Sequence, residues 1–77
     1  MTADQLRAGR ALLKWTVRDM AEKAGVTPNT VSRIENGGDA KASTLTEMRA
    51  ALETAGIEFI AENGGGAGVR FRERAGR

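Results

Sequence analysis

The sequence predicts a small, mainly α-helical domain that ends in a two-stranded β-hairpin. Apolar residues recur at helical spacing through residues 3–55, in segments bounded by capping residues and glycines. Beyond them, two segments rich in β-branched and aromatic residues flank a glycine-rich run, a pattern typical of a hairpin. A chain of 77 residues has room for one modest core, and we expect four to five short helices around it.

Composition excludes several classes of protein. The chain has no cysteine and no histidine, which excludes a disulfide framework and a zinc site of the usual Cys/His type. It also has no tyrosine and no close carboxylate pair in a plausible cleft, so we expect no enzymatic activity and no cofactor. No apolar run approaches the roughly 20 residues of a membrane span. The N-terminus lacks a signal-peptide pattern, so a soluble, cytoplasmic protein is expected.

Charge is concentrated at the C-terminal end. The formal net charge is only +2, yet residues 70–77 contain four arginines and one glutamate. The rest of the chain has eight basic and nine acidic residues and is therefore close to neutral.

The first two helices are predicted at residues 3–14 and 16–24. Leu6 and Leu13 mark the apolar face of the first. Thr16 followed by Asp19 resembles a capping box at the start of the second, and Gly25 marks its end.

A third helix is predicted at residues 27–36. Thr27 is an N-cap candidate, Pro28 suits the first helical position, and Asn36-Gly37 is a stop signal. Val31 and Ile34 define a narrow buried stripe. The remaining face is small or polar, so this helix is expected to be anchored along one edge and to offer the other edge to a polar partner.

A fourth helix follows a polar loop at residues 38–43. Ser43 or Thr44 is expected to cap it, with Thr44 and Glu47 as a possible capping box, and Gly56 to end it. Residues 57–61 and 69–74 are then expected to pair as the hairpin across the glycine-rich run. That run lacks the Lys-Ser/Thr pair and the following helix of a nucleotide-binding loop.

Two short helices joined through Gly25 form a helix-turn-helix pattern. Residues 6–57 resemble the XRE-type helix-turn-helix regulators, the family of the lambdoid phage repressors and Cro. The spacing of Ala21, Gly25 and Val31 is the most characteristic part, because a small residue lets the two helices cross, glycine makes the turn and valine fills the angle. The other matching positions are Leu6, Arg10, Thr16, Val26, Ile34, Glu35, Asn36, Gly37, Leu45 and Leu52.

The resemblance implies a lambda-repressor-like bundle whose third helix enters the major groove of DNA. Asn29, Ser32 and Arg33 would then contact bases, an amide suiting adenine and a guanidinium suiting guanine. The implied contacts with the DNA backbone are Thr16, Thr27, Thr30, Asn36 and Lys41. Arg10 and Glu35 match the family's structural ion pair.

Two residues depart from the family pattern. Val17 stands where the family often has a glutamine that contacts the DNA backbone. Pro28 stands where relatives often have a polar side chain that contacts bases. Because Pro28 offers no such contact, base recognition is shifted onto Asn29, Ser32 and Arg33.

The tail resembles that of small bacterial regulators of the same superfamily, with a similar Glu-Asn-Gly-Gly-Gly segment before Gly-Val-Arg. We expect a DNA-binding domain at residues 1–56 and a dimerisation element at residues 57–77, because an isolated ribbon is marginally stable and has exposed edges. The residues expected in that interface are Phe59, Ile60, Val69 and Phe71. The alternative is a hairpin that packs only on its own helices. Arg70, Arg72 and Arg74 are either a solvated face or phosphate contacts.

The expected function is that of a homodimeric transcriptional repressor that binds double-stranded DNA. Repression is inferred only from the small size of the chain. The competing hypothesis is a protein-interaction module, such as an antitoxin that acts through the tail or an anti-repressor that keeps the fold without binding DNA. The polar face at Asn29 and Arg33 favours DNA binding.

Overall fold

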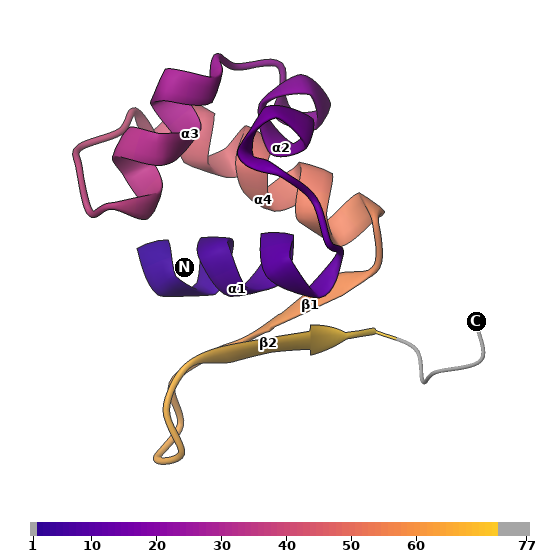
Figure 1. Cartoon of the computed structure of the whole chain (residues 1–77). Helices are drawn as coiled ribbons and strands as arrows, with labels where there is room; N and C mark the ends of the chain where they lie inside the picture. The colour runs from indigo at the N-terminus through magenta and orange to yellow at the C-terminus, as the bar shows by residue number, and fades with distance from the viewer. Residues whose placement is uncertain (1, 73–77) are drawn as a thin grey trace.

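The computed structural model describes residues 2–72, which form four helices and two strands (Figure 1). The elements are α1 (Ala3–Leu12), α2 (Val17–Ala24), α3 (Pro28–Glu35), α4 (Ala42–Thr54), β1 (Ile57–Ile60) and β2 (Gly68–Phe71). The predicted class, a mainly helical bundle with a C-terminal hairpin, is confirmed. The first helix ends two residues earlier than predicted, with Leu13 as its C-cap and Lys14 at φ 59°.

Local hydrogen bonds account for the starts of the first three helices. Thr16 and Asp19 form the predicted capping box of α2, with both bonds at 3.0 Å. Thr27 is the N-cap of α3, and its hydroxyl oxygen accepts from the Thr30 N–H. α1 has a capping box that was not predicted, in which the Gln5 side chain accepts from the N–H of Thr2.

The predicted start of the fourth helix is wrong. α4 begins at Ala42 with Lys41 as N-cap, and no side chain hydrogen-bonds to that cap. The Leu45 N–H donates to the Lys41 carbonyl at 3.1 Å, so the chain is already helical before either predicted cap. Ser43 and Thr44 therefore lie inside the first turn.

The helices enclose one hydrophobic core. α2 and α3 are joined through Gly25, which adopts the left-handed conformation at φ 73°. Ala21 and Val31 are buried where these helices cross, as the helix-turn-helix pattern predicted. The buried apolar residues are Leu6, Met20, Ala21, Ala24, Val31, Ile34, Met48, Leu52 and Ile57.

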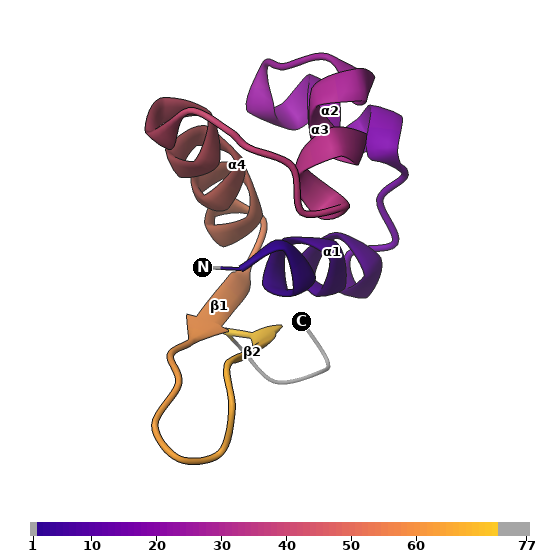
Figure 2. The ribbon, with the colours of Figure 1, turned by 90° about the vertical axis from the view of Figure 1, so that its left-hand side faces the viewer.

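The two strands form an antiparallel ribbon against α1 and α4 (Figure 2). The register pairs Ile57 with Phe71 and Phe59 with Val69, so these four side chains share one face of the ribbon. Ile57 is fully buried, so this face is directed towards the helices. The ribbon therefore completes the core of its own chain.

One buried side chain ties the ribbon to α1. The Gln5 Nε2 atom donates to the carbonyls of Ile60 and Gly68, at 3.2 and 2.9 Å. The Gln5 Oε1 atom accepts from the Thr2 N–H at 2.9 Å, so both ends of the amide are used. Gln5 is 6% exposed.

Candidate nucleic-acid interface

The outward face of α3 is polar and exposed. Asn29, Ser32 and Arg33 are exposed, and within residues 2–72 none of them makes a side-chain hydrogen bond or ion pair. The opposite face is buried through Val31 and Ile34. An amide, a hydroxyl and a guanidinium on one face provide the kinds of donor and acceptor that side chains use to bond base edges.

The two threonines at the start of α3 bond to one another. The Thr27 and Thr30 hydroxyl oxygens lie 2.9 Å apart, and the Thr27 oxygen also accepts from the Thr30 N–H at 3.2 Å. One hydroxyl proton is used within this pair. A single threonine hydroxyl proton is therefore left to donate to a ligand.

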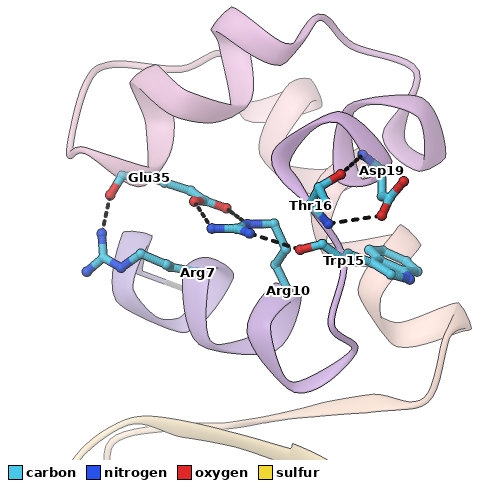
Figure 3. Close-up of polar contacts among 6 residues, drawn as sticks. All are labelled: Arg7, Arg10, Trp15, Thr16, Asp19 and Glu35. Atoms are coloured by element: carbon cyan, nitrogen blue, oxygen red, sulfur yellow. Dashed lines mark hydrogen bonds and ion pairs between the residues drawn. The ribbon is translucent and has the colours of Figure 1, made fainter.

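The N-terminus of α2 already has a carboxylate beside it. Asp19 Oδ2 accepts from the Thr16 N–H at 3.0 Å, and the Thr16 oxygen accepts from the Asp19 N–H (Figure 3). The Thr16 hydroxyl proton and the first amides of α2 remain available to an anion, but Asp19 opposes its charge. Arg18, between Thr16 and Asp19 in the sequence, is exposed.

Two arginines of α1 hold the C-terminus of α3 (Figure 3). Arg10 forms a double hydrogen bond with the Glu35 carboxylate, Nε to Oε2 at 2.8 Å and Nη2 to Oε1 at 2.9 Å. The hydrogen bond to Glu35 raises the pKa of Arg10 above its ordinary value. Arg10 also donates to the Trp15 carbonyl at 2.9 Å, and Arg7 donates to the Glu35 carbonyl at 2.6 Å. The orientation of α3 is thus tied to α1 through both side chain and backbone of Glu35.

Arg7 was missed by sequence reasoning, which assigned a contact with Glu35 to Arg10 alone. The sequence contains a weak signal for this contact, which is the spacing of Arg7 from Arg10. Arg7 lies one turn before Arg10 on the same face of the helix, as the i, i+3 spacing requires. Arg7 also pairs with the exposed Asp4 on its own helix.

A cleft of about 340 Å³ lies beside α3. Its lining comes from the turn before α3, α3 itself, the following loop and the first turn of α4, and comprises Val26, Thr27, Thr30, Arg33, Ala40, Lys41 and Thr44. Lys41 and Arg33 bring positive charge to this cleft, and Lys41 is exposed. Asn36, the C-cap of α3, is also exposed but does not line the cleft.

The residues expected in a dimer interface lie in different surroundings. Phe59 and Val69 pack against the core of their own chain, and Ile60 is half-buried on the opposite face of the ribbon. Phe71 is 41% exposed. The apolar face of the ribbon is therefore largely covered by its own helices.

The outer face of the ribbon has an ion pair. Arg70 donates to both carboxylate oxygens of Glu58 at 3.2 Å, which lowers the pKa of Glu58 and raises that of Arg70. Arg72 donates to the Glu53 carbonyl at 2.7 Å. Arg74 lies outside the described residues.

Two kinds of feature are absent from residues 2–72. No group of three or more acidic side chains is placed to hold a metal ion. In the same part of the chain, no helix has the length and hydropathy needed to cross a membrane.

Comparison with known proteins gives one result. A family model described as helix-turn-helix matches residues 6–59, well over half of the chain. A search of curated proteins gave no match. The matched segment contains most of α1, all of α2–α4 and most of β1, and so it includes the whole exposed face of α3.

Proposed function

The chain belongs to the XRE-type helix-turn-helix family of DNA-binding transcriptional regulators, and we propose that it is a sequence-specific repressor that binds its operator as a homodimer. The observation that supports base recognition is the outward face of α3. Asn29, Ser32 and Arg33 are exposed there and make no side-chain hydrogen bond or ion pair within residues 2–72, so their hydrogen-bonding groups are available to DNA without breaking a bond in that part of the chain.

The chemistry of these three side chains determines which base edges α3 recognises in the major groove. Arg33 offers two parallel N–H donors to the O6 and N7 atoms of guanine, and Asn29 offers a donor and an acceptor to adenine. Ser32 bonds to either kind of base edge. Each good bidentate contact discriminates against a wrong base by about 1–3 kcal/mol.

Contacts to phosphates fix the position of α3 on the duplex. The proposed contacts are made by Thr16, Thr27, Thr30, Asn36 and Lys41. Lys41 is the only one with a formal charge, and Asp19 reduces the attraction at Thr16. Because each neutralised phosphate adds roughly 0.9 to the logarithmic salt slope, we expect a moderate slope rather than a steep one.

Dimerisation is proposed to occur through the edge of the ribbon rather than through its apolar face. The Arg72 N–H donates to the Gly56 carbonyl at 2.7 Å, which extends the register of the ribbon by one hydrogen-bonded pair. Hydrogen-bonded and non-hydrogen-bonded pairs alternate in an antiparallel ribbon, so the backbone N–H and C=O groups of Phe59 and Val69 point outward. An outward row of backbone groups favours pairing with another strand, and a second copy of the chain supplies one. A two-fold dimer suits operators whose half-sites lie about one helical turn apart.

Binding of the dimer to its operator is by itself sufficient for repression. A dimer bound across a promoter excludes the polymerase from the same DNA and requires no further contact. The competing hypothesis is a protein-interaction module that acts through the tail, for which the exposed face of α3 would be dispensable.

The test begins with selection of duplexes from a random-sequence pool by the purified protein. Fluorescence anisotropy then compares the selected and scrambled duplexes at two salt concentrations. We expect Arg33→Ala to remove most of the preference for the selected duplex. Arg49→Ala is the matched control, because it also removes one exposed arginine but does so away from α3. Arg49 lies on α4, with its Cζ atom 5.0 Å from the centroid of the Phe59 ring in the hairpin. If no sequence is enriched, or if both substitutions weaken both duplexes equally, sequence-specific recognition by α3 is refuted.

The proposed dimer is tested on the wild-type protein, without any substitution. Sedimentation equilibrium gives the mass over a range of concentrations, and hydrogen exchange follows the Val69 amide over the same range. We expect the Val69 amide to become more protected as the dimer forms. A monomer at all concentrations, with non-palindromic selected sites, would contradict the proposal.

A further inference from the structure

Two consecutive glycines end α3, and they are needed for different reasons. The Gly37 N–H donates to the Ile34 carbonyl at 3.0 Å and the Gly38 N–H to the Arg33 carbonyl at 2.8 Å, which together close the end of the helix. Gly37 has φ 90°, a conformation that L side chains rarely adopt, and a Cβ there would meet nothing within 4 Å. Gly37 is therefore required by its backbone conformation.

Gly38 is required by space. Its backbone lies outside the left-handed region, so its conformation does not by itself demand glycine. A Cβ at this position would lie 2.6 Å from Arg33 Cγ and 2.9 Å from the Arg33 carbonyl oxygen. The stem of the Arg33 side chain, together with the Arg33 carbonyl oxygen, thus occupies the space that a side chain at position 38 would fill.

From this contact we infer that Gly38 is a positioning residue for Arg33 and that it helps to determine which DNA sequence is bound. The inference rests on the proposed function, in which Arg33 contacts bases. The Arg33 guanidinium has no hydrogen bond or ion pair within residues 2–72, so the placement of its stem governs where it points. A side chain at position 38 must push Cγ aside, and the guanidinium, further along the chain, moves more than Cγ does. Bidentate recognition of a base edge does not tolerate such a displacement.

The positioning step is tested in the free protein, without DNA. Three-bond couplings to Cγ report the χ1 angle of Arg33 by NMR in wild type, Gly38→Ala and Gly37→Ala. We expect Gly38→Ala to change the Arg33 χ1 population, because a rotamer change is the simplest way to remove a 2.6 Å contact. Gly37→Ala strains the same helix end at φ 90° but places no atom within 4 Å of its Cβ, so it should leave the Arg33 χ1 population unchanged. An unaltered Arg33 χ1 in Gly38→Ala overturns the inference, whatever the protein binds.

The effect on recognition is tested by a double-mutant cycle on the selected and scrambled duplexes. We expect Arg33→Ala to reduce the preference for the selected duplex by roughly 5- to 150-fold, the range of one bidentate contact. Gly38→Ala should lose a large part of the same factor while affinity for scrambled DNA is kept. In the Arg33→Ala background, Gly38→Ala should change nothing further, because the side chain it displaces is gone.

Three results would contradict this inference. One is an equal effect of Gly38→Ala with and without Arg33. Another is a loss of preference in Gly37→Ala as large as that in Gly38→Ala, because the helix end and not the stem would then be responsible. The third is an unchanged preference in Gly38→Ala. A wild-type protein without sequence preference refutes the proposed function instead, and the χ1 measurement still decides the role of Gly38.

Discussion

The ion pair between Arg10 and Glu35 should be one of the most sensitive points of the fold. The Glu35 side chain is 6% exposed and that of Arg10 is 19% exposed. Arg10→Met removes one partner and leaves the more deeply buried carboxylate without its double hydrogen bond. Glu35→Leu leaves the guanidinium, which retains the Trp15 carbonyl and some contact with water. We therefore expect Arg10→Met to cost more than Glu35→Leu.

The size of the destabilisation by Arg10→Met follows from the burial of the ion pair. Breaking a buried pair by removing one partner costs about 3–5 kcal/mol, and the partial exposure of Arg10 favours the lower end, about 3 kcal/mol. A domain of this length has a total free energy of unfolding of roughly 4–12 kcal/mol. At about 4–8 °C per kcal/mol, the melting temperature should fall by roughly 12–24 °C. The carboxylate anchors α3 to α1, so DNA affinity should fall with it.

Urea denaturation followed by Trp15 fluorescence measures these changes, because Trp15 is the only tryptophan and its carbonyl is one of the Arg10 partners. Glu53→Gln is the control. It removes the charge of a similar pair with Arg49 whose side chains are 46% and 41% exposed, and it should cost no more than about 0.5 kcal/mol.

The double substitution Arg10→Met with Glu35→Leu decides whether the reasoning is right. If the cost of Arg10→Met arises from a stranded buried charge, removing that charge as well should recover most of the stability. A double variant as unstable as Arg10→Met would refute this explanation and would indicate that the shape of the two side chains, and not their charge, holds α3.

Three further predictions concern Gln5, Gly9 and the ion pair between Glu58 and Arg70. Gln5→Ala loses three hydrogen bonds of about 1 kcal/mol each, so it should destabilise the protein by roughly 2–3 kcal/mol and speed amide exchange in β2. A Cβ on Gly9 would lie 3.3 Å from the Leu52 Cδ1 atom. Gly9→Val should therefore lower the free energy of unfolding, measured by thermal unfolding, by about 1–3 kcal/mol. In Gly9→Ala, the gain of roughly 1 kcal/mol in helix propensity should offset the crowding. Arg70 lowers the pKa of Glu58, so this pair stabilises the fold at pH values above the ordinary pKa of glutamate. That contribution is lost as the pH falls through the pKa of Glu58 in the folded protein. NMR titration of Glu58 should show its pKa rising in Arg70→Gln, and an unchanged pKa would contradict the pairing.

The helix boundaries that sequence reasoning predicted well were those determined by local bonds. Thr16 with Asp19 and Thr27 with Pro28 act within one turn, so their roles depend on spacing along the chain rather than on the fold. The same reasoning failed for α4, whose start at Ala42 has no side-chain cap. There the packing of the helix on the core replaced the local signal that Ser43 and Thr44 had suggested.

For the candidate site, the sequence determined which residue types stand on the outward face of α3. The 3.6-residue period places Asn29, Ser32 and Arg33 opposite the buried Val31 and Ile34, and this needs no tertiary information. The roles of these residues on DNA stay predictions.

Only the tertiary structure decided the contacts between segments distant in the chain. The period of two along a strand places Val69 and Phe71 on one face, but it does not say that this face packs on α1 and α4 of the same chain. The contacts of Arg7 with the Glu35 carbonyl and of Gln5 with the ribbon join residues 28 or more positions apart. Periodicity and capping depend on neighbours within a few residues, whereas these contacts exist only once the elements have packed. For that physical reason, the sequence alone determined the helices and the exposed face of α3, and tertiary packing decided how that face is held.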